Sequence, residues 1–309
     1  MSAEAAEPAK VILLGEHFVV HGSRAVSLAI DRLARARVRR SRSTSVRLRF
    51  VDADGSVREA RPGPESHLYR YVEEVGRRLS IGPLDVEVAV DFPISAGLGS
   101  SASMAAALAR AAYRLARGRE PARDEVYALA NLMEEMVHGR PSGIDLNTVL
   151  EKAVILYDGG ARRVVDRVVG PELWLVVADT GERRVTGRVV SFVGRVKREM
   201  GGVFTGLLEA VDAMSVEGFA AVRRGDLRTV GLLMSANHGI LYSIGVSTHL
   251  IERLVVKLSG MGAYGAKLTG AGGGGCVIAL FGDGESAEEA AETLVSEGLQ
   301  AFAVRPLYA

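Results

Sequence analysis

Residues 93–101 (PISAGLGSS) constrain the fold more than any other part of the sequence. They follow apolar residues that alternate over residues 84–92, as in a strand, and precede an alanine-rich run over residues 101–117, which has the composition of a helix. Gly97 and Gly99 let the backbone approach a bulky anion, and the first amides of the helix carry the positive end of its dipole. A strand, glycine loop and helix in this order favour phosphate binding.

The hydroxyl groups of Ser100 and Ser101 add hydrogen-bond donors to this loop, or a ligand for the Mg²⁺ that accompanies ATP. The loop has the spacing of neither a Walker motif nor a Rossmann fingerprint. Taken alone, the segment is also compatible with a plain glycine turn followed by a serine cap.

A second glycine-rich segment, residues 269–276 (TGAGGGGC), leads directly into the apolar residues 276–281. Each glycine costs roughly 0.5–1 kcal/mol relative to alanine in regular structure, so four in succession indicate that a ligand or another backbone comes close. A flexible linker is the alternative. The apolar strand that follows favours a second wall of the phosphate site.

A third segment, residues 134–145 (EEMVHGRPSGID), brings two acids to the end of a predicted helix and the turn after it. Glu134 follows core-facing positions of that helix and is a candidate Mg²⁺ ligand. Asp145 is a candidate base, because phosphoryl transfer relies on positioning, charge neutralisation and an aspartate that accepts the hydroxyl proton. Alternatively, Ser142 and Asp145 form a capping-box-like start to a helix after Ile144.

The length of 309 residues and the 48% hydrophobic content predict two domains, which we place at residues 1–165 and 166–309. The junction lies near two adjacent glycines within the polar residues 158–163. Runs of strands beside runs of helices predict an α+β architecture. The periodicity predicts helices at residues 68–79, 101–117, 122–137, 189–200, 203–214, 227–237, 249–258 and 287–297, and strands at residues 11–14, 34–38, 46–50, 84–92, 153–157, 173–178 and 276–281.

The charge balance of +1 requires no nucleic acid, membrane or polyanionic partner. Arginines alternate with apolar residues over residues 32–49, which is typical of a sheet with one exposed face. With no signal-peptide pattern, no apolar run long enough to span a membrane and the single cysteine Cys276, we expect a cytoplasmic protein. His17, His138 and His238 lack partners at metal-ligand spacing, so Mg²⁺ is the only metal expected.

The three segments together resemble the three signature motifs of the GHMP kinases, the superfamily of galactokinase, homoserine kinase, mevalonate kinase and phosphomevalonate kinase. Within it, residues 10–22 (KVILLGEHFVVHG), 138–145 (HGRPSGID) and 267–276 (KLTGAGGGGC) look most like mevalonate kinases, as do Asn237, His238 and residues 244–247 (IGVS). The resemblance implies an N-terminal ribosomal-protein-S5-like domain and a C-terminal ferredoxin-like domain. It also implies ATP-dependent phosphorylation of mevalonate to mevalonate 5-phosphate, a step of isoprenoid biosynthesis.

The resemblance also implies the role of individual residues. Asp145 would deprotonate the alcohol with Lys10 as its neighbour, where the lysine charge keeps the aspartate ionised and steadies the phosphoryl oxygens. A solvated strand start is the alternative for Lys10. Ser101 and Glu134 would hold Mg²⁺. The residues that would bind ATP are Ala96, Gly97, Leu98, Gly99, Ser100, Ser101, Gly272 and Gly273. Those that would contact the substrate are Glu16, His17, Thr180, Gly270 and Ala271.

Two positions depart from the family pattern: Ala9 and Ser95 stand where glycine is common. Neither change removes a catalytic group. Two alternatives to mevalonate phosphorylation stay open. Phosphomevalonate or another small hydroxy acid is one, for which Arg183 and Arg184 offer contacts to a second phosphate. A non-catalytic ligand sensor on the same fold is the other. The resemblance is also compatible with a homodimer.

Overall fold

The computed structural model describes residues 2–60, 66–139, 141–183 and 186–309, and the chain divides into two compact units. The first unit comprises Met1–Ala9, Arg32–Pro93 and Gly99–Leu150, and the second comprises Lys10–Asp31, Ile94–Leu98 and Glu151–Ala309. Strands β1 (Ser2–Leu14) and β2 (Arg24–Arg40) contribute residues to both units. The predicted domain division at residue 165 stays a prediction.

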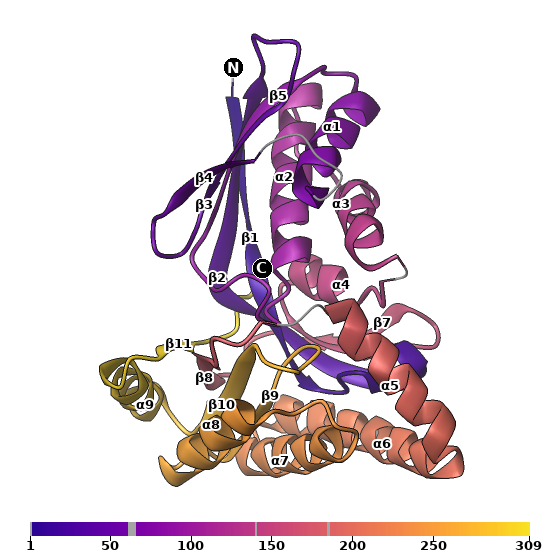
Figure 1. Ribbon diagram of the computed structural model, residues 1–309, viewed down its shortest axis with the longest axis vertical. Coiled ribbons are helices and arrows are strands. Elements are labelled where there is room, and N and C mark those ends of the chain that lie inside the picture. Colours follow the sequence, from indigo (N-terminus) through magenta and orange to yellow (C-terminus); the bar gives the residue numbers. More distant parts are fainter. Residues whose placement is uncertain (1, 61–65, 140, 184–185) are drawn as a thin grey trace. The chain divides into compact units, whose positions relative to one another are not determined.

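The first unit combines a sheet with three helices that pack together on one face of it (Figure 1). The strand order is β4-β3-β5-β2, and β1 also pairs with β2. β5 pairs antiparallel with β2 and parallel with β3. The elements are β3 (Arg47–Val51), β4 (Val57–Ala60), β5 (Leu84–Val90), α1 (His67–Leu79), α2 (Ser100–Arg117), α3 (Arg123–His138) and the short α4 (Ile144–Glu151).

The arginines of β2 lie on the exposed face of this sheet. Ala34, Ala36 and Val38 are buried, whereas the arginines between them and after them are exposed, as the alternation predicts. Arg39 pairs with Asp85 of β5 at 3.2 Å. Comparable pairs join Arg37 to Glu4 at 2.6 Å and Arg49 to Glu87 at 3.2 Å. Neighbouring acids therefore balance much of the positive charge on this face.

Helix α2 is buried along most of its length because its alanines leave little side chain between it and its neighbours. Ser103 donates a hydrogen bond from its hydroxyl to the carbonyl of Pro8 at 2.7 Å, and Tyr71 of α1 donates to the carbonyl of Ala105 at 2.8 Å. These bonds satisfy hydroxyl groups that would otherwise be buried without a partner. They also fix the helix that follows residues 93–101.

The second unit contains a four-stranded antiparallel sheet in the order β11-β8-β10-β9, which is the ferredoxin-like order 4-1-3-2. A second group of strands joins β2 to the hairpin of β6 and β7. The elements are the 3₁₀ helix η1 (Phe18–His21), β6 (Val154–Asp158), β7 (Arg163–Val168), β8 (Trp174–Asp179), β9 (Gly265–Leu268), β10 (Cys276–Phe281), β11 (Gln300–Val304), α5 (Thr186–Met200), α6 (Gly202–Arg224), α7 (Leu227–Ser243), α8 (His249–Gly260) and α9 (Gly284–Ser296). The predicted α+β class is confirmed.

Strand β10 is buried along its whole length. All six of its residues are buried, and alternate ones (Val277, Ala279, Phe281) join a core that includes Leu258 of α8 and Leu294 of α9. The thiol of Cys276, the first residue of β10, is fully buried, and burial raises its pKa well above the usual value.

Several elements are longer than the sequence patterns predict. Helix α6 continues to Arg224 and α7 to Ser243. Strand β2 begins at Arg24, before the predicted start at residue 34. Its first half was missed because residues 25–30 are all buried and lack the alternation that marks the second half. The polar residues 158–163 form the turn of the β6–β7 hairpin. Among the described residues, none of the helices combines the length and the apolar character required to span a lipid bilayer.

Helix α7 and strand β9 meet backbone to backbone at two glycines. A Cβ atom on Gly231 would lie 2.4 Å from the carbonyl carbon and oxygen of Tyr264, and one on Gly265 would lie 1.9 Å from the carbonyl oxygen of Gly231. Only glycine fits either position.

We therefore expect Gly231→Ala to lower the free energy of unfolding by at least about 2 kcal/mol, since the added methyl group must displace backbone. Gly239→Ala is the matched control on the same helix, where an added Cβ meets nothing within 4 Å. This control should raise stability by up to about 1 kcal/mol because alanine favours the helix. Urea unfolding of both variants measures the difference, and equal effects would contradict the proposed close approach.

Candidate active site

The loop of residues 93–101 follows a backbone path that glycine favours. Gly97 and Gly99 have positive φ angles of 92° and 70°, and Ser95, one of the two expected departures from the family pattern, also has a positive φ of 56°. A non-glycine residue in this region is strained, so the departure at Ser95 keeps the loop path at a conformational cost.

Helix α2 begins at Ser100 with Gly99 as its N-cap residue. Glycine has no side chain with which to cap the helix, so the amides of the first turn point outward at the positive end of an 18-residue helix. This geometry can bind an anion.

Ser101 and Glu134, the predicted metal ligands, lie side by side. The Ser101 hydroxyl donates to Oε1 of Glu134 at 2.5 Å, and Glu134 is buried on the last turns of α3. Within the part of the chain that the structure describes, no three His, Cys, Asp or Glu side chains gather to hold a metal ion. A hydroxyl and a carboxylate fit Mg²⁺, which keeps water ligands and shares phosphate oxygens rather than occupying a full protein cage.

The two glycine-rich loops contact each other through their backbones. The amide of Cys276 donates to the carbonyl of Ala96 at 2.9 Å. A Cβ atom on Gly97 would lie 2.4 Å from the carbonyl oxygen of Thr269, and one on Gly270 would lie 2.7 Å from the Cα atom of Gly97. The expectation that another backbone approaches the second loop is therefore met.

A small cavity of about 30 Å³ lies between these loops. This volume is about that of one water molecule. The cavity brings together predicted ATP-binding and substrate-binding residues, and it is lined by Ser95, Ala96, Gly97, Thr269, Ala271, Gly272, Gly274 and Gly275.

His17 links the turn after β1 to the second loop. Its Nε2–H group donates to the carbonyl of Ala271 at 2.8 Å, and its own backbone has a positive φ of 63°. Burial lowers the pKa of His17 to about 4, although the bond to Ala271 opposes this shift, so the imidazole is neutral at neutral pH. The structure thus brings together two of the predicted substrate-binding residues.

Glu16 forms a buried ion pair with Lys267, a residue to which the sequence analysis gave no role. The side chains of both are at most 1% exposed, and Lys267 also donates to the carbonyl of Leu268 at 2.8 Å. Burial raises the pKa of Glu16 and lowers that of Lys267, while the attraction between the two opposes both shifts. Oε2 of Glu16 has no hydrogen-bond partner among the described residues. The signals available for Lys267 were the apolar residues around it and its place at the start of residues 267–276.

Lys10 lies within the second unit and contacts the first loop. Its Nζ donates to the carbonyl of Gly97 at 3.3 Å, and its amide donates to the carbonyl of Leu98 at 3.0 Å. Since Lys10 is only 1% exposed, the alternative of a solvated strand start is wrong.

Asp145 lies in the first turn of α4 and is partly buried. Before it in the chain, the Ser142 hydroxyl accepts a hydrogen bond from the amide of Ile144 at 3.4 Å. This bond is consistent with a capping role for Ser142, which was one part of the alternative interpretation of this segment. Asp145 and Lys10 belong to different units, so their pairing stays a prediction.

Thr180 holds the second loop in place. Both its hydroxyl and its amide donate to the carbonyl of Gly275, at 2.8 Å and 3.0 Å. A substrate contact by Thr180 also stays a prediction.

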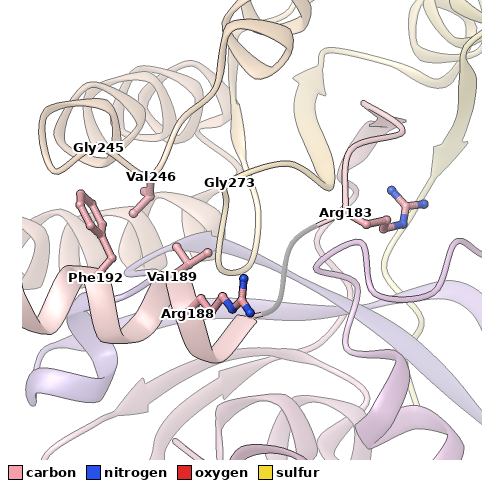
Figure 2. Close-up of a pocket in the computed structure, with 7 residues that line it drawn as sticks. All are labelled: Arg183, Arg188, Val189, Phe192, Gly245, Val246 and Gly273. Carbon is pink, nitrogen blue, oxygen red and sulfur yellow. The ribbon is translucent and has the colours of Figure 1, made fainter.

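A larger pocket of about 440 Å³ lies between the start of α5 and the second loop (Figure 2). Val189, Phe192 and Arg188 line it from α5, opposite Gly245, Val246 and Gly273. Arg183 also lines it, but its guanidinium group donates to both carboxylate oxygens of Asp179 at 2.8 and 2.5 Å. The predicted ATP-binding residue Gly273 therefore faces this pocket rather than the small cavity.

Comparison with known proteins identifies the class of this site. The model of the GHMP kinases N-terminal domain matches residues 66–150, and that of the GHMP kinases C-terminal domain matches residues 219–300. Mevalonate kinase from Aeropyrum pernix is 36% identical over 97% of this chain and 95% of its own length. Mevalonate kinase from Methanothermobacter thermautotrophicus is 32% identical over 90% of each chain.

Solved structures agree with the sequence comparison. The L. major mevalonate kinase in complex with R-mevalonate superposes with a TM-score of 0.83 at 28% identity, and it covers 99% of this chain and 97% of its own. The Methanococcus jannaschii mevalonate kinase gives 0.80 at 26% identity, with 99% and 98% covered. Fold and site thus define an ATP-dependent kinase of small molecules. The chain belongs to the GHMP kinases, among which its relatives are mevalonate kinases.

The lowered pKa of His17 predicts a specific pH dependence of stability. The unfolded histidine titrates near 6.5 and the folded one near 4, so the unfolded state binds more protons between these values and stability falls as the pH falls through them. This effect should cost the wild type about 2 kcal/mol between pH 7 and pH 5.

We expect His17→Asn to lack this loss, because asparagine does not titrate and adopts a positive φ more readily than most residues do. Urea unfolding measures the free energy of unfolding of both proteins at pH 7 and at pH 5. The difference between wild type and variant should be about 2 kcal/mol smaller at pH 5 than at pH 7. His249→Asn, at an exposed position, controls for the substitution. If this difference is the same at both pH values, His17 is not the cause of the loss of stability at low pH.

Proposed function

We propose that this protein transfers the terminal phosphoryl group of ATP to mevalonate and forms mevalonate 5-phosphate for isoprenoid biosynthesis. The observation that carries the proposal is the 36% identity to the Aeropyrum pernix mevalonate kinase over nearly the whole chain. The local geometry supports it, because each motif that the resemblance assigns to phosphate, metal or substrate has a suitable conformation.

The phosphates of ATP would bind the loop that contains Ala96, Gly97 and Leu98 and continues through Gly99, Ser100 and Ser101 into α2. The support is the left-handed backbone and the outward amides of the helix. Gly272 and Gly273 would approach the phosphates from the second loop, where positive φ angles of 66° and 68° let the chain turn tightly without a side chain in the way.

Ser101 and Glu134 would hold Mg²⁺. The ion supplies neutralisation of the charge on the phosphates when it is bound. The hydroxyl and the carboxylate already lie 2.5 Å apart, so little rearrangement is needed to present two oxygen atoms to one cation.

Asp145 would accept the proton of the substrate hydroxyl as phosphoryl transfer proceeds. Lys10 would supply a positive charge for the phosphoryl oxygens and keep the aspartate ionised. The support for Lys10 is its burial and its bond to Gly97 in the phosphate loop, which direct its ammonium group toward that loop.

Glu16, His17, Thr180, Gly270 and Ala271 would contact mevalonate. With Nε2–H donated to Ala271, the neutral His17 ring retains Nδ1 as a hydrogen-bond acceptor for a substrate hydroxyl. The carbonyl groups and glycine backbone around it offer polar contacts without bulk.

The alternative substrate phosphomevalonate requires cationic groups for its second phosphate. Arg183 is engaged by Asp179 in a bidentate pair, which reduces its availability, and Arg184 lies outside the described residues. A ligand sensor would tolerate loss of Asp145 or Lys10, and this chain has both. The cytoplasmic location and the homodimer remain predictions.

The test is ATP consumption with Mg²⁺ against mevalonate, phosphomevalonate, homoserine and galactose, with the product identified by phosphorus NMR. We expect turnover of mevalonate to the 5-phosphate and little turnover of the others. Preference for another alcohol would support a kinase with a different substrate. Absence of turnover with all four compounds would favour the ligand-sensor alternative.

Asp145→Asn should lower kcat by about a hundredfold or more, the usual worth of a positioned base, while ATP affinity changes little. Asp124→Asn is the matched control, because Asp124 is an acid in the first turn of α3 whose side chain is 94% exposed. Steady-state kinetics and ATP titration measure both quantities. Near-normal kcat in the Asp145 variant would remove it from the role of base.

A further inference from the structure

The turn between α7 and α8 touches the second glycine-rich loop, although the proposed function gives it no role. The carbonyl of Val246 in this turn accepts a hydrogen bond from the amide of Gly273 at 2.6 Å. A Cβ atom on Gly272 would lie 2.4 Å from the same carbonyl oxygen. The path of the loop through Gly272 and Gly273 therefore depends on where this turn lies.

Glu252 of α8 fixes the turn. Its Oε1 accepts hydrogen bonds from the hydroxyl of Ser247 in the turn and from Nε2–H of His238 on α7, the latter at 3.1 Å. Nδ1 of His238 accepts from the amide of Leu268 at 3.4 Å, on the strand that leads into the loop. One carboxylate oxygen thus joins the two helices, the turn and, through His238, the start of the loop.

His238 is held as a neutral donor in this arrangement. Burial lowers its pKa, Glu252 opposes that shift and Lys267 adds to it. A neutral ring whose Nδ1 accepts from a backbone amide carries its hydrogen on Nε2, where Glu252 receives it.

Thr248, the next residue of the turn, reaches the other end of the loop. Its hydroxyl donates to Oε2 of Glu182 at 2.6 Å, and the carbonyl of Glu182 accepts from the amide of Gly275 at 3.0 Å. The same hydroxyl accepts from the amide of Ile251 at 3.4 Å and so caps α8. The loop is therefore held at its entry, its middle and its exit by groups that converge on this turn.

We propose that Glu252 is a positioning residue for phosphoryl transfer, because it fixes Ser247 and His238 and through them holds the second glycine-rich loop against its substrates. The side chain of Glu252 hydrogen-bonds to Ser247 and His238, neither of which is assigned to ATP, metal or substrate, so it acts through the turn. The proposal rests on the proposed kinase function for its kinetic consequence. Its structural half, the holding of the loop, can be observed without any substrate.

The test compares Glu252→Ala with Glu252→Gln in the full-length protein. Glutamine retains an amide oxygen that can accept both bonds, whereas alanine removes the acceptor. Asp226→Ala is the matched control, since Asp226 caps the far end of α7 by accepting from the amide of Thr229 at 3.1 Å and its loss weakens the helix without reaching the loop. The measurements are Tm, kcat and KM for both substrates, and amide deuterium exchange of residues 268–276.

We expect Glu252→Ala to lower kcat/KM by about tenfold or more, as small misplacements of binding groups do, and to accelerate exchange in residues 268–276. Glu252→Gln should keep most of the wild-type kcat/KM and most of the slow exchange in these residues. Asp226→Ala should lower Tm with little effect on kcat/KM or on loop exchange. Ser247→Ala removes one of the two donors to Glu252, so it should lower kcat/KM and accelerate loop exchange less than Glu252→Ala does. It replaces Glu252→Ala in the test if that variant does not fold.

The proposal is overturned if Glu252→Ala, or Ser247→Ala in its place, lowers only Tm, as the Asp226 control does, and leaves kcat/KM and loop exchange unchanged. Absence of mevalonate turnover in the wild type would instead reject the proposed function. In that case unchanged exchange in the Glu252 variants would still reject the holding of the loop, and faster exchange would support it.

Discussion

The buried ion pair of Glu16 and Lys267 is the interaction on which the site depends most. The two residues are 251 positions apart, and either charge left alone in this environment would cost several kcal/mol. The turn after β1 and strand β9 must therefore lie together wherever this unit is folded. That requirement places His17 against Ala271 and carries the second glycine-rich loop to the first. Lys267 adds a bond to the carbonyl of Leu268, so the strand backbone is satisfied along with the charge.

The glycines of the two loops leave a surface here that is made of backbone atoms. At Gly97 and Gly270 any side chain would collide with the opposite loop, and at Gly272 it would collide with Val246. Amides and carbonyls consequently line the small cavity where larger residues would otherwise project. Phosphate and hydroxyl groups are recognised well by such surfaces, because backbone donors are rigid and already oriented. The cost is a loop with little packing of its own, which explains why it is tied at several points to neighbouring segments.

Local sequence signals predicted the parts of the fold that are set locally. The glycine loop before α2, the alanine-rich helix itself and the apolar strand β10 lie within a residue or two of the predicted bounds. Strand β9 was not predicted, because four residues are too few to show a period, and Lys267 within it shows no sign of a partner far away in the sequence. Glu252 was missed for the same reason, since its partners come from a different helix and a turn. The role of Asp145 as a base was suggested by its segment and then by the resemblance, whereas the role of Lys10 came from the resemblance alone, and both remain predictions.

The burial of Cys276 makes the only thiol of the chain a reporter of its folded state. Alkylating reagents and oxidants attack the thiolate, and a buried thiol with a strongly raised pKa offers neither that species nor access to it. The sulfur lies where the second glycine-rich loop enters β10, an interior strand of the four-stranded sheet. Labelling of this sulfur would therefore count only molecules in which that region has opened, with no engineered probe and no competing cysteine.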